Sequence, residues 1–338
     1  MRRILAGLVI GVVLPAAVAA QRPFDLPLRP VNTYSIVARD SATGQLGVAV
    51  QSHWFSVGSI VTWAEAGVGA VATQSFIEPS YGPLGLTLLR AGKTAEQALA
   101  ALLAGDAHPD VRQVAMVDAE GRVAVHTGAS AIESAGHISG NGFSVQANMM
   151  LNPTVPAAMA RAYQSTRGDL ADRLMAALAA AQAEGGDIRG SQSAAILVVR
   201  GESTGRPWAD KLFDLRVEDH PDPVGELTRL VHLARAYNHM NAGDEAMTVG
   251  DIQAALREYA AAEAMVADSL TNGEMVFWHA VTLVGVGRVD ESLPYFRRAF
   301  AEDANWVELV RRLPKAGQLP ADPAIIGRIL AVAPDNES

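Results

Sequence analysis

The sequence predicts an α+β fold built from layers of helix and antiparallel sheet, followed by a module that is helical throughout. Over residues 33–219, patterns come in the order strands, helices, strands, helices, strand. Such grouping fits layered helix and antiparallel sheet better than a regular strand–helix alternation. From about residue 224 the pattern is almost wholly helical. A four-layer αββα sandwich accommodates the first region, and the pattern alone does not separate it from a two-layer fold.

The strands are predicted from short runs in which apolar and polar residues alternate. Residues 33–40 (TYSIVARD) and 45–52 (QLGVAVQS) form two such runs around the turn-forming DSATG, and residues 68–75 (VGAVATQS) form a third. The other expected strands are a hairpin that turns at residues 119–121, residues 142–150 and residues 193–201.

The helices are predicted where apolar residues recur at three- and four-residue spacing. Thr94 is a suitable N-cap because Gln97 follows three residues later, and Gly92 and Gly105 are stop signals. The helices expected in the first region span residues 82–92, 94–105, 156–166 and 169–186.

The C-terminal module, residues 224–317, contains an internal repeat that resembles the tetratricopeptide pattern. Its matching positions are Ala255, Tyr259 and Ala262, followed 37 residues later by Ser292, Phe296 and Ala299, with Ala280, Leu283 and Gly287 upstream of the second set. Residues 241–251 (NAGDEAMTVGD) read as an insertion between two helices. Two units are few for a free-standing array, so we expect the module to pack on the first domain. Residues 220–223 (HPDP) are the expected linker, and residues 318–338 the C-terminal tail.

The N-terminus has the layout of an export signal. Arg2 and Arg3 precede an apolar run shorter than the roughly 20 residues of a spanning helix, and small residues follow it. We expect a signal peptide over residues 1–20, cleaved near Ala20, and then a leader or propeptide over residues 21–32. The alternative is an uncleaved anchor. Cleavage would leave a periplasmic or secreted protein without a membrane anchor.

Composition excludes several classes of function. The chain has no cysteine, so it has no thiolate nucleophile, disulfide or cysteine-ligated metal. Its formal net charge is −9 with no long basic run, which argues against nucleic acid as a partner. The eight histidines lack metal-ligand spacing, and GVGAVA (residues 67–72) precedes a strand rather than a helix. We therefore expect no metal and no cofactor.

Thr33, at the start of the first strand, has a possible chemical use. If the peptide bond before it is cut, its α-amine lies beside its hydroxyl, and an amine with a pKa near 8 can accept the hydroxyl proton. One residue then supplies both nucleophile and base. The alternative is that Thr33 is only a β-favouring residue at a strand start.

Several linked motifs resemble a bacterial family, the domain of unknown function numbered 1028. They are TYSIVARDSATGQLGVAVQS, GVGAVATQS, YGPLGL, VQANMM and GGDIRGSQSAAILVV, spread over residues 33–200. The resemblance implies an N-terminal nucleophile (Ntn) hydrolase-like fold and no settled substrate. It also implies that Thr33 corresponds to the residue following the initiator Met in members without an export signal. In this chain, exposure of Thr33 needs a second cut after Asn32, which Ntn precursors commonly make themselves.

Other residues are nominated as companions of Thr33. Asp187 with Ser191 or Ser193 is similar to a D-x-x-S arrangement beside the amine, although Asp187 and Arg189 could equally form a loop ion pair. Gln74 and Asn148 are uncharged donors suited to an oxyanion or a substrate amide, or to strand-end backbone groups. Ser52 and His53 end the second strand, near where the resemblance to Ntn enzymes implies a cationic residue that supports the site. His53 would be a weak one.

Two functions therefore stay open. One is an exported amide hydrolase, without metal or cofactor, acting on a small amide or peptide-like substrate through Thr33. The other is a non-catalytic binding or assembly protein, in which Thr33 stays acylated and the helical module binds a protein partner. A homodimer is compatible with both. The chemical state of the Thr33 amine separates them.

Overall fold

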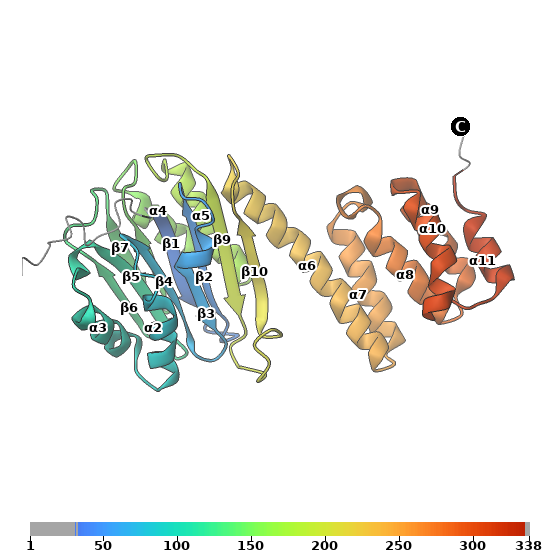
Figure 1. Cartoon of the computed structure of the whole chain (residues 1–338), viewed down its shortest axis with the longest axis horizontal. Helices are drawn as coiled ribbons and strands as arrows, with labels where there is room; N and C mark the ends of the chain where they lie inside the picture. Colours follow the sequence, from blue (N-terminus) through green and yellow to red (C-terminus); the bar gives the residue numbers. More distant parts are fainter. Residues whose placement is uncertain (1–30, 32, 335–338) are drawn as a thin grey trace, which may run out of the picture.

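The computed structural model describes residue 31 and residues 33–334, and it has a mixed α+β region followed by a helical region (Figure 1). Both sheets of the α+β region are antiparallel throughout. The α+β class and the helical C-terminal region are thus as predicted. The expected signal peptide and most of the expected leader lie outside the described residues. Among the residues described, no helix is long and apolar enough to cross a bilayer.

The larger sheet has six strands in the order β10-β9-β2-β1-β8-β7. Its strands are β1 (Thr33–Arg39), β2 (Leu46–Ser52), β7 (Gly136–Gly140), β8 (Phe143–Ala147), β9 (Ser193–Val199) and β10 (Lys211–Val217). The first strand lies near the centre, paired with β2 on one side and β8 on the other. Alternation along β1 sends Thr33 and Ser35 to one face and Tyr34 to the other.

The smaller sheet has four strands in the order β3-β4-β5-β6. These are β3 (Thr62–Glu65), β4 (Gly69–Ser75), β5 (Arg112–Asp118) and β6 (Val123–Thr127). The hairpin predicted around residues 119–121 joins β5 to β6. An apolar core forms between the sheets, with Val48 and Val50 from β2 and Ala70 and Ala72 from β4 fully buried in it. One face of each sheet therefore packs against the other sheet.

Helices cover the outer face of each sheet. Helices α4 (Val155–Ser165) and α5 (Leu170–Ala183) bury their apolar residues with those of the six-stranded sheet, and α2 (Tyr81–Arg90) and α3 (Ala95–Gly105) with those of the four-stranded sheet. A one-turn helix, α1 (Gly58–Val61), leads into β3. The predicted cap of α3 forms, since Thr94 accepts from the Gln97 N–H and the Gln97 side chain accepts from the Thr94 N–H.

The helical region leads away from the sheets along one long helix (Figure 1). Its helices are α6 (Pro223–Thr248), α7 (Ile252–Met265), α8 (Glu274–Gly285), α9 (Val289–Glu302), α10 (Asn305–Arg312) and α11 (Pro323–Leu330). The first turns of α6 join the core of the six-stranded sheet through Val224, Leu227 and Val231. The stretch expected as an insertion, residues 241–251, instead continues α6 as far as Thr248, because it holds no proline and Gly243 is tolerated within the helix. Helix α11 lies in the segment expected as a tail.

Gly243 of α6 allows the Tyr259 ring of α7 to pack closely against α6, because a Cβ at residue 243 would lie 2.4 Å from that ring. We expect Gly243→Ala to destabilise the helical region by about 1–3 kcal/mol through overpacking. Gly285 ends α8 and has nothing within 4 Å of its would-be Cβ. Gly285→Ala is therefore the matched control, with unchanged or slightly raised stability. Thermal unfolding of both variants measures the difference, and equal melting temperatures would rule out the proposed packing constraint.

Candidate functional site

The chain crosses from one sheet to the other just before β1. Val31 pairs with Ser75, the last residue of β4, through two backbone hydrogen bonds: Val31 N donates to Ser75 O at 2.7 Å, and Ser75 N to Val31 O at 2.9 Å. Two residues later, Thr33 pairs with Ser52 of β2 in the six-stranded sheet. Val31 and Thr33, only two residues apart, are therefore held by different sheets.

Four of the nominated residues form one row across adjacent strands of the six-stranded sheet. Thr33 lies opposite Ser52 on β2, and Ser52 lies opposite Ser193 on β9. On the other side of Thr33, the Asn148 N–H donates to the Thr33 carbonyl at 3.1 Å. All four are fully buried. The strand register thus brings Thr33, Ser52, Ser193 and Asn148 together at one end of the sheet.

Neutral groups hold Thr33 through its hydroxyl and through its backbone carbonyl. Its Oγ1 donates to the Val31 carbonyl at 2.9 Å. Its carbonyl accepts from Gln74 Nε2 at 3.2 Å and Asn148 Nδ2 at 3.5 Å, in addition to the Asn148 backbone. The hydroxyl therefore points back toward Val31, and Gln74 fixes the Thr33 carbonyl from the opposite sheet.

A buried amide network stands behind Thr33, and Gln113 of β5 is its centre. Gln113 Oε1 accepts from Gln74 Nε2 at 2.7 Å and Asn148 Nδ2 at 2.8 Å. Gln113 Nε2 donates to Thr127 Oγ1 at 2.9 Å and to the Ala147 carbonyl at 3.0 Å. Every side-chain N–H of Gln74 and Asn148 thereby has an acceptor. In this arrangement these two residues fix Thr33 rather than offering free donors to an oxyanion.

The network continues away from Thr33 through residues that sequence reasoning missed. Ser35 Oγ donates to Gln74 Oε1 at 2.6 Å and accepts from Gln146 Nε2 at 2.6 Å. Ser144 Oγ in turn donates to Gln146 Oε1 at 3.1 Å. The available signal was the strand alternation, which places Gln113 on the same face as the buried Ala115 and Val117, and Gln146 on the same face as Ser144. A polar residue in that register needs partners from a facing layer.

Ser193 holds the loop after β2. Its Oγ donates to the Trp54 carbonyl and accepts from the Val57 N–H at 3.1 Å. This serine is therefore already engaged by the backbone of the loop that leads to α1.

Asp187 and its neighbours form a separate cluster at the edge of the site. The Asp187 carboxylate accepts from Arg189 Nη2 at 2.6 Å and from the His53 backbone N–H at 3.2 Å. Together with burial, the charge of Asp187 raises the pKa of Tyr34 well above its usual range. Because Tyr34 points to the opposite face of β1 from Thr33, this carboxylate acts mainly on the helix-covered face.

Ser191 and His53 complete that cluster without entering the row. Ser191 Oγ donates to Gln182 Oε1 at 3.0 Å, and the same oxygen accepts from the Tyr34 hydroxyl at 2.9 Å. The backbone N–H of His53 donates to the Asp187 carboxylate, and His53 is exposed. The nominated residues thus divide between a row at Thr33 and a cluster around Asp187.

A buried ion pair supports the end of β4. Arg112 lies opposite Ser75, and its Nη1 donates to the Phe76 carbonyl at 2.5 Å. Its Nε donates to Asp106 Oδ2 at 2.7 Å, and Tyr81 Oη donates to the same oxygen at 3.0 Å. Both charged side chains are over 90% buried. Arg112 therefore ties the residue after Ser75 to the loop after α3.

Asp106 gives stability a pH dependence. Burial would raise the pKa of Asp106, but hydrogen bonds from Arg112, the His108 N–H and Tyr81 outweigh it and lower this pKa to about 2. A carboxyl whose folded pKa is depressed stabilises the fold above its unfolded pKa, and that contribution is lost as pH falls from about 4 to about 2. We expect a loss of about 1–2 kcal/mol across this window, allowing for solvent screening. Denaturant unfolding of wild type and Asp106→Asn checks this, since the variant should lack that part of the pH dependence.

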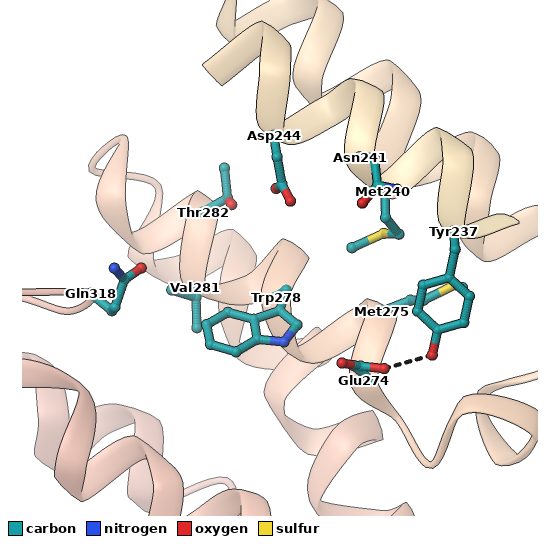
Figure 2. Close-up of a pocket in the computed structure, with 10 residues that line it drawn as sticks. All are labelled: Tyr237, Met240, Asn241, Asp244, Glu274, Met275, Trp278, Val281, Thr282 and Gln318. Carbon is teal, nitrogen blue, oxygen red and sulfur yellow. Dashed lines mark hydrogen bonds between the residues drawn. The ribbon is translucent and has the colours of Figure 1, made fainter. Parts of the chain in front are cut away.

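A second candidate site is a pocket of about 430 Å³ in the helical region. Figure 2 shows residues of α6 and α8 facing one another across it, with Trp278 and Val281 opposite Asp244. Its other lining residues are Tyr237, Met240, Asn241, Glu274, Met275, Thr282 and Gln318. Tyr237 donates to Glu274 at 2.6 Å, and burial together with this bond raises the pKa of Tyr237 to about 12. The walls combine a half-buried indole, two thioethers and two carboxylates.

Comparison with known proteins shows the family of this chain. The model of a family of unknown function, DUF1028, matches residues 33–227, and the chain belongs to that family. The crystal structure of protein SPO2555 from Silicibacter pomeroyi, which carries the same family description, is similar at 30% identity with a TM-score of 0.52. The similarity covers 59% of this chain and 87% of that one. No curated protein matches the sequence.

Proposed function

We propose that this protein is an exported amide hydrolase of the N-terminal nucleophile type, with Thr33 as its nucleophile. The observation that carries the proposal is the position of Thr33. It begins a central strand, its hydroxyl lies between two sheets, and its backbone is held by neutral donors from both. Two facing antiparallel sheets with helices outside are also the layers expected of an Ntn-hydrolase-like fold.

The first step is exposure of the nucleophile. Thr33 Oγ1 attacks the carbonyl carbon of Asn32, the bond from that carbon to the Thr33 nitrogen breaks, and the nitrogen takes the hydroxyl proton. Water then hydrolyses the resulting ester and releases the leader. The Thr33 hydroxyl already points toward the leader, since it donates to the Val31 carbonyl.

Turnover repeats this chemistry on a separate substrate. The free α-amine of Thr33 takes the hydroxyl proton while Oγ1 attacks the amide carbon, and it then gives that proton to the departing amine. An ester on Thr33 remains. Water, deprotonated by the same amine, attacks the ester, the acid leaves, and the proton returns to Oγ1. Thr33 is kept in place during both acylation and deacylation by Gln74, Gln113 and Asn148.

Mass spectrometry of the exported protein tests this proposal. After brief incubation with an N-acyl amide, we expect the acyl mass on the peptide that begins at Thr33, together with the released amine. Acyl adducts only at lysines or at hydroxyls other than that of Thr33 would exclude Thr33 as the nucleophile.

As a second candidate, we propose that the helical region is a tetratricopeptide-like module that binds a protein segment. The pocket between α6 and α8 favours it, because an apolar floor rimmed by Asn241, Asp244 and Glu274 suits a peptide. A photo-crosslinker at Gln318 should then yield one defined adduct in cells, and Trp278→Ala should abolish it. An adduct that survives Trp278→Ala would count against this pocket.

A further inference from the structure

Strand β4 has an open edge beside Thr33, and Val31 pairs with it. Pairing with β3 ends at Ala72, which lies opposite Thr62. The following residues of β4 pair with β5 on their other side, as Ser75 does with Arg112. Val31 takes the side that β3 leaves free. Val31 therefore extends the four-stranded sheet by strand addition.

This edge holds both the backbone and the side chain of Val31. Ser75 has a left-handed backbone (φ 71°), rare for a residue other than glycine, and both its N–H and its C=O bond to Val31. The Val31 side chain is 99% buried in the core between the sheets. We call this position, formed by the Ser75 backbone and the apolar core around Val31, the seat. The seat binds the N–H, the carbonyl and the small apolar side chain of one residue.

We propose that this seat is the acyl-side binding site of the enzyme, so that its substrates are peptides or peptidyl amides. It rests on the proposed function. Val31 is the second residue before the bond to Thr33, and removal of the leader frees the same edge. A substrate with its scissile carbonyl at Thr33 then places its second residue on Ser75. This second residue of the substrate therefore has an unsubstituted N–H and a carbonyl for the two bonds to Ser75, and a small, branched apolar side chain like that of Val31.

The seat is tested first without any chemistry. In the full Thr33→Ala precursor, which keeps its leader, we expect the amides of Val31 and Ser75 to exchange hydrogen at least about a hundredfold more slowly than unpaired amides. Val31→Asp should remove the Ser75 protection while leaving that of Ala72, and Val31→Ile should keep both. Fast exchange at Ser75 in the Thr33→Ala precursor would overturn the seat.

Specificity is tested next on the exported protein. The substrates are acetyl-Arg-Pro-X-Asn aminocoumarin amides, where X is valine, aspartate or N-methylvaline. We expect kcat/KM to fall at least about a hundredfold for aspartate, whose charge would be buried. It should fall at least about tenfold for N-methylvaline, which cannot donate to Ser75.

The outcomes separate the seat from the hydrolase. If kcat/KM is the same for all three residues X, the proposed specificity is overturned, and the proposed amide hydrolase activity stands. If no amide is cleaved and the leader stays attached, the proposed function fails and with it the substrate class.

Discussion

Replacing Thr33 by alanine should abolish both removal of the leader and amide turnover, lowering kcat/KM more than about a thousandfold. Alanine lacks the oxygen that attacks the carbonyl. The fold should survive, because the substitution removes one hydrogen bond, from Thr33 Oγ1 to the Val31 carbonyl, with a net value of about 1 kcal/mol. Intact mass gives the processing result and release of amine gives the rate.

Thr33→Ser is the matched control, because serine keeps the hydroxyl and the α-amine. We expect it to process its leader and to retain turnover within about a hundredfold of wild type. Alanine and serine variants with equal activity would remove Thr33 from the mechanism. A Thr33→Ala protein that fails to fold would be recognised by its circular dichroism, so loss of activity alone would not be read as loss of the nucleophile.

The second large effect is expected from Gln113→Ala. Gln113 Oε1 is the acceptor for the amides of both Gln74 and Asn148, and all three residues are fully buried. Truncation leaves two amide N–H groups without that acceptor and opens a cavity between the sheets. We expect a loss of about 3 kcal/mol in the free energy of unfolding. Because Gln74 and Asn148 also hold the Thr33 carbonyl, processing should slow at least about tenfold.

Ser144→Ala is the control within the same network. Ser144 contacts Gln146 and lies beyond Ser35, so it reaches Thr33 only through several intermediaries. We expect a cost of about 1 kcal/mol with unchanged processing. Denaturant unfolding and a time course of leader release measure the two effects separately. Equal processing in Gln113→Ala and Ser144→Ala would show that the network supports the core but does not position Thr33.

Local signals predicted the parts of the fold that depend on few residues. The capping box of Thr94 and Gln97 and the turn at residues 119–121 are each set by neighbours in the chain, and both form. Strand β10 was missed because it is an edge strand with several exposed residues, so its pattern lacks a buried stripe. Strand β7 was missed for the same reason.

The site was predicted only in part, because its geometry depends on which strands face one another. The row of Thr33, Ser52, Ser193 and Asn148 follows from strand pairing in one sheet. Gln113 was missed because it joins Gln74, on the neighbouring strand of its own sheet, to Asn148, which belongs to the other sheet and lies 35 residues away in the chain. The seat on Ser75 was likewise hidden, since an open edge becomes visible only when the end of β3 is known.

The N-terminus of the exported protein tests the central claim most directly. The full precursor with its signal is expressed, the exported protein is purified, and its first residue is read by intact mass and terminal sequencing. The mechanism proposed here predicts a chain that begins at Thr33, and a Thr33→Ala protein that still carries its leader. A wild-type chain that begins near Gln21 and stays so would contradict it, because Thr33 would then have no free amine.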